Sequence, residues 1–196
     1  MPPGADTPLA PPRRPGRPRS QDADVAILDA ALALLTDEGY ARMTMDGVAA
    51  AAGVSKATIY LRYRSKADLA TAALAHLRDT VGPEPTGDLR TDLVALLRQV
   101  RRNTARFRVM PLIGTCLAEE QHTPELLPLF RERSVRPRRA RLAAMLETAG
   151  GAPEQVGPAV DMLMGAFHMR SLAGDPFPAD WEERVVDIAL AGLGLA

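Results

Sequence analysis

Residues 44–63 read TMDGVAAAAGVSKATIYLRY, and this stretch decides the fold. Thr44 is a good N-cap for a first short helix, because its hydroxyl oxygen can accept from an amide of the first turn. Gly53 suits the end of that helix, where the chain often needs a positive φ. Ser55 can cap a second helix over residues 56–63. Two short helices joined by a tight turn predict a helix-turn-helix, whose second helix enters the major groove of DNA.

The same pattern also fits an alanine-rich helical hairpin in an ordinary bundle. The second helix would then present Tyr60 as a core aromatic, whereas a DNA-reading helix would present it to base edges. Ile59 and Tyr63 lie on the apolar side of this helix in both interpretations. Spacing alone leaves the two interpretations open.

The residue identities over about 22–77 carry a resemblance to a known family. The matching segments resemble the DNA-binding domain of the tetracycline-repressor (TetR) family of bacterial regulators, and they are Gly39-Tyr40, Thr44–Ala49, Ala52–Tyr60, Tyr63 and Ser65–Leu69. One departure is Met43, where a threonine is frequent in the family, and it weakens one expected phosphate contact. The resemblance implies an N-terminal helix-turn-helix followed by a C-terminal helical domain that binds an inducer and dimerises.

The resemblance also implies a set of DNA-binding residues. Base edges are expected to meet Lys56, Ala57, Tyr60 and Leu61. A lysine can donate to guanine acceptors, and small apolar side chains can pack on a thymine methyl group. Phosphates, which fix register without reading sequence, are expected to meet Thr44, Thr58, Arg62 and Lys66. Ser55, at the start of the recognition helix, completes the expected set.

Composition points to one class of protein. The 196 residues are 46% hydrophobic but only 4% aromatic, so an aliphatic core and an all-α fold are expected. The net charge is zero, and any DNA affinity must therefore come from local clusters of charge. A single cysteine suits a reducing cytosol. No membrane span or signal peptide is recognisable, so a cytoplasmic bacterial protein, associated with the nucleoid, is expected.

The chain divides into three parts. Residues 1–20 form a proline-rich basic arm that cannot fold alone; it either reaches phosphates and the minor groove or is a solvated leader. Residues 21–81 form the DNA-binding domain and residues 82–196 the C-terminal ligand-binding and dimerisation domain, with a breaker run GPEPTG between them. Nine helices are predicted in all, over residues 22–38, 44–52, 56–63, 66–80, 88–108, 111–120, 124–149, 153–173 and 180–193.

Three expectations concern single helices. The first helix should bury a stripe made of Val25, Leu28, Ala31, Leu32 and Leu35. The helix over residues 88–108 should turn a solvated face carrying Arg98, Arg101, Arg102 and Arg106. Pro137 is interior to the helix over residues 124–149 and should kink it.

The sequence contains no motif that supports catalytic or cofactor chemistry. The three histidines, His76, His122 and His168, have no metal-ligand spacing with one another or with cysteine. No glycine-rich phosphate loop or nucleophile elbow occurs. We therefore expect no metal, no cofactor and no enzymatic activity.

The C-terminal half holds soft and aromatic side chains on several helices, and these are candidate inducer contacts by the resemblance: Phe107, Met110, Cys116, Phe130, Met145, Met162, Phe167 and His168. Each could equally be ordinary core. An apolar or amphipathic ligand is expected between the kinked helix and the helix over residues 153–173. The last two helices are the expected homodimer surface.

Two classes of function follow from this. The first is a homodimeric regulator, a repressor that binds a pseudo-palindromic double-stranded DNA operator and is released by a small-molecule inducer. The second is a DNA-binding dimer without a small-molecule ligand, gated by a protein partner or ungated. A cavity of a few hundred Å³ with convergent polar groups would favour the first.

Overall fold

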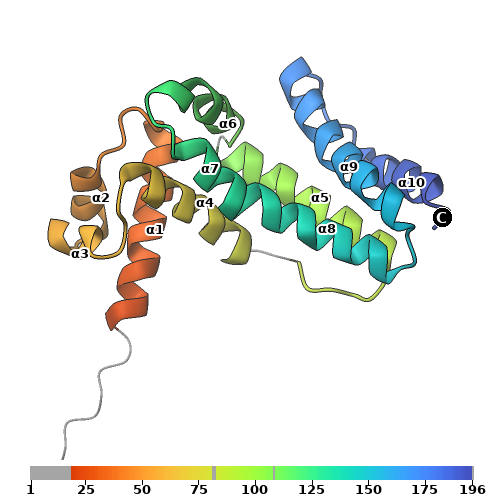
Figure 1. The fold of residues 1–196 in the computed structure, drawn as a ribbon, viewed down its shortest axis with the longest axis horizontal. Coiled ribbons are helices and arrows are strands. Elements are labelled where there is room, and N and C mark those ends of the chain that lie inside the picture. The colour runs from red at the N-terminus through yellow and green to blue at the C-terminus, as the bar shows by residue number, and fades with distance from the viewer. Residues whose placement is uncertain (1–18, 81–82, 108, 196) are drawn as a thin grey trace, which may run out of the picture.

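Figure 1 shows the chain in a computed structural model that describes residues 19–80, 83–107 and 109–195. Within these ranges every regular element is helical, which confirms the all-α prediction. The elements in chain order are α1 (Arg19–Asp37), α2 (Met45–Ala52), α3 (Lys56–Tyr60), α4 (Lys66–Thr80), α5 (Leu89–Arg106), α6 (Val109–Ala118), a 3₁₀ turn (Glu119–Gln121), α7 (Leu126–Phe130), a π-helical segment (Arg131–Val135), α8 (Arg136–Thr148), α9 (Pro153–Ala173) and α10 (Trp181–Gly192). Residues 1–18 of the expected basic arm lie outside the described residues, and its last two residues already belong to α1.

The helix expected over residues 124–149 is the one that differs most. It is divided into α7, the π-helical segment and α8. Pro137 lies in the first turn of α8, where its missing N–H costs least. The π-helical turn before Pro137 replaces the i→i−4 backbone hydrogen bonds of an α-helix. The proline ring therefore interrupts no regular α-helical bond there. The other eight predicted helices are present with ends shifted by a few residues.

The helix-turn-helix is capped as the sequence predicts. The Thr44 hydroxyl accepts from the Gly47 amide at 3.0 Å, and the Ser55 hydroxyl accepts from the Thr58 amide at 3.1 Å. Gly53 ends α2 with a φ of 65°, which a residue with a Cβ would adopt only under strain. The recognition helix α3 is shorter than predicted, ending at Tyr60 instead of near residue 63.

The buried stripe of α1 differs from the predicted one. Val25 is 44% exposed, whereas Ile27, which the predicted stripe leaves out, is fully buried. Ile27, Ala31 and Leu35 recur every four residues and are all buried. The difference arises because α1 packs against both α2 and α4, so two neighbours decide which side is covered.

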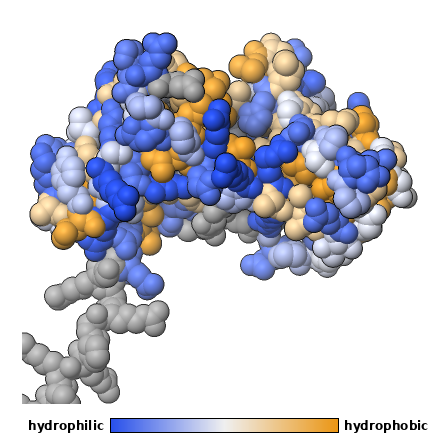
Figure 2. All heavy atoms as spheres, viewed as in Figure 1, coloured by the Kyte–Doolittle hydropathy of each residue, from blue (hydrophilic) through white to orange (hydrophobic). Residues whose placement is uncertain are grey.

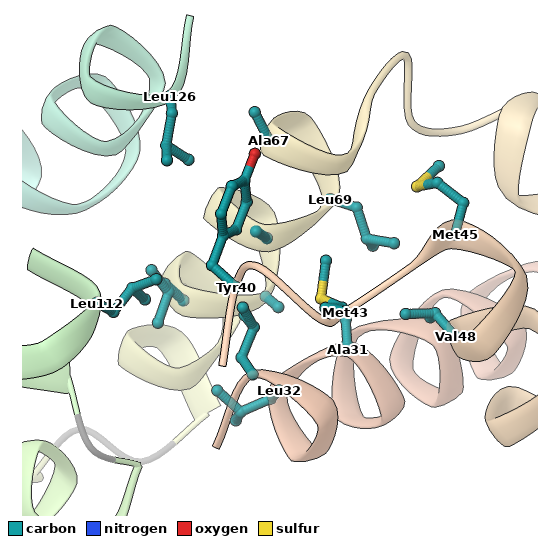
Figure 3. Close-up of a cluster of buried hydrophobic side chains, with 14 of the residues drawn as sticks. Ala31, Leu32, Tyr40, Met43, Met45, Val48, Ala67, Leu69, Leu112 and Leu126 are labelled. Atoms are coloured by element: carbon teal, nitrogen blue, oxygen red, sulfur yellow. The ribbon is translucent and has the colours of Figure 1, made fainter. Parts of the chain in front are cut away.

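The core of the DNA-binding helices continues into the C-terminal half. One cluster of buried side chains joins α1–α4 to α6 and α7. Figure 3 shows Tyr40 between Met43 and Leu69 on one side and Leu112 and Leu126 on the other. Burial raises the pKa of Tyr40 to about 12. Helices α6 and α7 therefore share one buried core with the DNA-binding helices.

A second core cluster joins α5, α8, α9 and α10, which lie together in the right half of Figure 1. Ion pairs across α5 and α10 lie beside this core. Arg98 pairs with Glu183, and the Arg101 Nε lies 2.5 Å from the fully buried carboxylate of Glu182. The expected solvated arginine face is therefore wrong for Arg98 and Arg101, because α10 brings acidic residues from about 85 positions away onto them.

Large apolar side chains remain exposed on the last two helices. They are Met162, Met169 and Leu172 on α9 and Ile188 on α10, each more than half exposed. Figure 2 shows orange, hydrophobic atoms on the outer surface at the α9–α10 end of the molecule. We call this set the α9–α10 apolar face. Among the described residues, no helix combines the length and the apolar character needed to cross a lipid bilayer.

Candidate nucleic-acid interface and ligand cavity

Helix α3 presents four predicted base-reading residues together. Lys56, Ala57, Tyr60 and Leu61 are all exposed, with Tyr60 at 50% and Leu61 at 84%. Ile59, on the opposite side, is fully buried and holds the helix against the domain. The exposure of two large apolar side chains on one short helix is unusual for a monomeric soluble surface and is typical of a binding face.

Lys56 is held by a carboxylate of the preceding helix. Its Nζ lies 2.7 Å from Asp46 Oδ1, and the hydrogen bond to Asp46 raises the pKa of Lys56. The same ammonium lies 5.9 Å from the Tyr60 ring centroid, which is within cation–π range. Both partners are on the solvent side of the helix-turn-helix, so the lysine is positioned but remains accessible. Asp46 was not among the expected site residues.

Two predicted DNA-contacting residues serve as helix caps, and a third bonds to one of them. Thr44 and Ser55 cap α2 and α3, and the Ser55 and Thr58 hydroxyls lie 2.8 Å apart. A hydroxyl can cap a helix and still accept or donate at a second position. The phosphate contacts expected of Thr44 and Thr58, and the DNA contact expected of Ser55, stay predictions.

Arg62 and Lys66 are both partly exposed and bond to neighbouring parts of the DNA-binding domain. Arg62 Nε donates to Asp24 Oδ1 on α1 at 2.5 Å, and Lys66 Nζ donates to the Ala41 carbonyl oxygen at 3.0 Å. The Lys66 ammonium also lies 4.4 Å from the Tyr40 ring centroid, and burial lowers its pKa. Each of these two residues therefore ties the recognition unit to α1 or to the α1–α2 turn, in addition to any phosphate contact.

Met43 belongs to the core. Its side chain is fully buried and lies beside Val48 and Leu69 in Figure 3. The side chain at this position thus points inward, and the methionine serves packing.

A cavity of about 350 Å³ lies in the C-terminal half. Its walls come from α4, α5, α6, α7, the π-helical segment, α8 and α9. In Figure 2 the surface is hollowed between the α6–α7 region and α9. The lining residues are Leu74, Val100, Asn103, Thr104, Val109, Met110, Ile113, Gly114, Leu117, Phe130, Ser134, Val135, Arg138, Met164, His168 and Leu172. The cavity lies between the interrupted helix and α9, the place predicted from the sequence for a ligand.

Three of the eight candidate ligand residues line this cavity, namely Met110, Phe130 and His168. Burial lowers the pKa of His168, whose Nδ1 lies 2.8 Å from the Met164 carbonyl oxygen. Because a carbonyl only accepts, Nδ1 carries the proton and Nε2 is left as an acceptor.

The other five candidates do not line this cavity, and their contact with a ligand stays a prediction. Met162 is 56% exposed on the α9–α10 apolar face, and Met145 packs against the second core. Phe107 and Cys116 pack in the first core, where burial raises the pKa of the Cys116 thiol to about 11. Phe167 stacks on Phe177 at 5.5 Å between ring centroids. Periodicity could not separate these positions, because it shows which residues are apolar and not which helix covers them.

Four polar residues that line the cavity were not among the predicted ligand contacts: Asn103 and Thr104 on α5, and Ser134 and Arg138. Ser134 and Arg138 lie four positions apart, so they fall on one side of the helical path from the π-helical segment into α8. That spacing was readable, but nothing in the sequence indicated that this side faces a cavity. In the described part of the chain, no group of three or more His, Cys, Asp or Glu residues could hold a metal ion.

Comparison with known proteins agrees with this arrangement. Residues 27–73 match the family model described as bacterial regulatory proteins, tetR family, and residues 83–189 match the tetracyclin repressor-like C-terminal domain. An uncharacterised HTH-type transcriptional regulator of Mycobacterium tuberculosis is 33% identical over 190 residues, covering 93% of this chain and 90% of that one.

Two further relatives support the same assignment. The DNA-binding transcriptional repressor TetR of Mycobacteroides abscessus is 36% identical over 140 residues, which is 69% of this chain and 72% of that protein. The crystal structure of a TetR family transcription regulator superposes with a TM-score of 0.70 at 31% identity, covering 87% of this chain and 98% of that one. The chain is a transcriptional regulator and not an enzyme, and it belongs to the TetR family.

Proposed function

We propose that this regulator is a ligand-responsive repressor, which binds a pseudo-palindromic operator as a homodimer and is released by a small-molecule inducer. The observation that carries the proposal is the cavity of about 350 Å³, whose walls include α4, α6 and α7. These helices share their core with the helix-turn-helix. A molecule that fills the cavity therefore presses on the elements that hold the recognition helix in place.

The DNA-reading part of the proposal rests on the exposed side of α3. Lys56 and Tyr60 supply hydrogen-bond donors on the exposed side of α3, while Ala57 and Leu61 offer apolar contact to a thymine methyl group. Thr44, Ser55, Thr58, Arg62 and Lys66 surround this reading face and are proposed to contact phosphates.

Homodimerisation rests on the α9–α10 apolar face. One recognition helix reads too few base pairs to be selective, and two-fold symmetric helix-turn-helix proteins solve this by binding two half-sites. An apolar surface made of Met162, Met169, Leu172 and Ile188 is suited to self-association, since a C₂ interface uses the same patch on both subunits.

Release follows from linkage between the two sites. An inducer can shift DNA affinity only by its differential affinity for the DNA-competent and the released conformations, typically about 1–3 kcal/mol. The test is calorimetry of a ligand that releases the protein from its operator, performed with and without operator DNA. Operator DNA should weaken ligand binding by the same factor by which the ligand weakens operator binding. Equal ligand affinity in both experiments would favour the alternative, a DNA-binding dimer that no small molecule gates.

A further inference from the structure

The polar residues of the cavity lie on three of its walls: Asn103 and Thr104 on α5, Ser134 and Arg138 on the path from the π-helical segment into α8, and His168 on α9. Ser134 and Arg138 follow one another at four-residue spacing, and His168 faces them from α9. The positive charge of Arg138 contributes to the lowered pKa of His168, so the two side chains are close in space. The remainder of the lining is mostly aliphatic, with Phe130, Met110 and Met164 as the soft or aromatic members.

Ser134 is a buried polar group that lacks a partner. The residue is 6% exposed, and within the described residues its Oγ has no hydrogen-bond partner. Buried hydroxyls are normally satisfied, because leaving one unpaired costs free energy. Ser134 lines the cavity although its Oγ is itself covered, so a rotation of the side chain would bring the unpaired hydroxyl to a bound molecule, which would supply the missing partner.

The charge of the lining is one-sided. Arg138 contributes a permanent positive charge, and no acidic side chain lines the cavity among the residues that the structure describes. Burial and the nearby guanidinium keep His168 neutral at neutral pH, so it adds no second charge. A guanidinium has five N–H donors, so Arg138 can bind a ligand carboxylate while keeping a contact with the protein.

We propose that the inducer is an amphipathic organic anion with an apolar body and a single carboxylate- or sulfonate-type head. The head lies between Arg138 and Ser134, which both donate to it, and the body fills the aliphatic part of the cavity between α5, α6 and α9. The methionines adapt to the shape of the body. This inference rests on the proposed function, because it names the class of molecule that the same cavity takes.

The test uses two fluorescent probes that differ only in the anionic head. These are 8-anilinonaphthalene-1-sulfonate and its uncharged analogue N-phenyl-1-naphthylamine, titrated into the full-length protein. Gly114→Phe identifies the share of binding that belongs to the cavity, because a Cβ at Gly114 meets no atom within 4 Å and the ring can enter the open space. Gly114→Phe should therefore lower the protein's affinity for the sulfonate by a larger factor than its affinity for the uncharged analogue.

Substitution of the head-binding residues should then separate the two probes. Arg138→Met should weaken the sulfonate on the order of tenfold, the usual effect of losing a charge-assisted hydrogen bond, and leave the uncharged analogue unchanged. Ser134→Ala should lower the affinity for the sulfonate severalfold. Arg138→Lys, which keeps the positive charge, should retain most of the affinity that Arg138→Met loses. Arg136→Met, which removes an exposed arginine on the same helix, should change neither probe. Thermal unfolding followed by circular dichroism shows whether each variant is folded.

Two results would overturn the proposal, and they differ in what they imply. If Gly114→Phe removes both probes but Arg138→Met affects them equally or not at all, the anionic class is wrong while a ligand cavity remains. If Gly114→Phe affects neither probe, the cavity takes no such molecule and the proposal is wrong, while calorimetry with and without operator still decides the ligand-responsive function.

Discussion

Arg133, on the π-helical segment, is bonded to Asp68 in the first turn of α4. Its Nη1 donates to the Asp68 carbonyl oxygen at 2.6 Å, and its Nη2 pairs with the Asp68 carboxylate. The other carboxylate oxygen of Asp68 accepts from the Arg64 amide at 2.7 Å, four residues after α3 ends. Ser134, the next residue after Arg133, lines the cavity. A short chain of bonded groups thus connects the cavity wall to the segment behind the recognition helix.

Breaking this connection should reduce ligand coupling more than DNA binding. Arg133→Met removes the guanidinium but keeps the length of the side chain. We expect the free energy of unfolding to fall by about 1–3 kcal/mol, since a partly buried carboxylate loses its charged partner. Operator affinity without ligand should change little, while release by an inducer should need more ligand. Operator titrations with and without inducer measure both.

The matched control for this prediction is Arg131→Met, on the same π-helical segment but exposed. It should alter neither the unfolding free energy nor the coupling. If Arg133→Met loses operator affinity in proportion to stability and leaves release unchanged, Arg133 is only a structural support.

Residues that contact bases and residues that contact only phosphates should differ in how their loss changes DNA affinity with DNA sequence and with salt concentration. Lys56→Ala is expected to cost about 1–3 kcal/mol on the best operator and to relax preference at one position of each half-site. Lys66→Ala should weaken all duplexes nearly alike and lower the salt slope by about one per subunit. Titrations on operator and scrambled DNA at several salt concentrations distinguish the two. Equal weakening of both DNAs by Lys56→Ala would show that Lys56 meets only phosphate.

The buried carboxylate of Glu182 should depend on Arg101. Removing one partner of a buried pair typically costs about 3–5 kcal/mol, and we expect somewhat less for Arg101→Met because this arginine is about one-third exposed. The double variant Arg101→Met with Glu182→Met should recover much of the lost stability, since no charge is left buried. Denaturant unfolding of the wild type, both single variants and the double variant gives the coupling energy. A double variant as unstable as Arg101→Met would contradict this account.

The α9–α10 apolar face should control the oligomeric state. Ile188→Glu and Met169→Glu each place a charge on this face, and we expect a monomer in sedimentation at micromolar concentration, with weakened operator binding. Val25→Glu, at an exposed apolar position on α1, is the matched control and should sediment as the wild type. A wild-type protein that is monomeric both with and without operator would remove the basis of the dimer proposal.

The sequence by itself determined the local structure of this protein. Hydroxyl caps at Thr44 and Ser55 and a left-handed glycine at Gly53 act over three or four residues, so they were readable without tertiary information. The exposed positions of α3 were readable for the same reason, since a five-residue helix with Ile59 buried leaves its opposite side to solvent.

Only the tertiary structure decided which residues face each other across helices. The apolar candidates Cys116, Met145 and Phe167 could not be separated from true cavity residues, because packing partners come from distant parts of the chain. The ion pairs between α5 and α10, and the ion pair of Arg133 with Asp68, join residues more than 60 positions apart. No local sequence pattern indicates them. Periodicity records whether a side chain is apolar, whereas burial, pairing and the cavity depend on how much space the neighbouring helices leave.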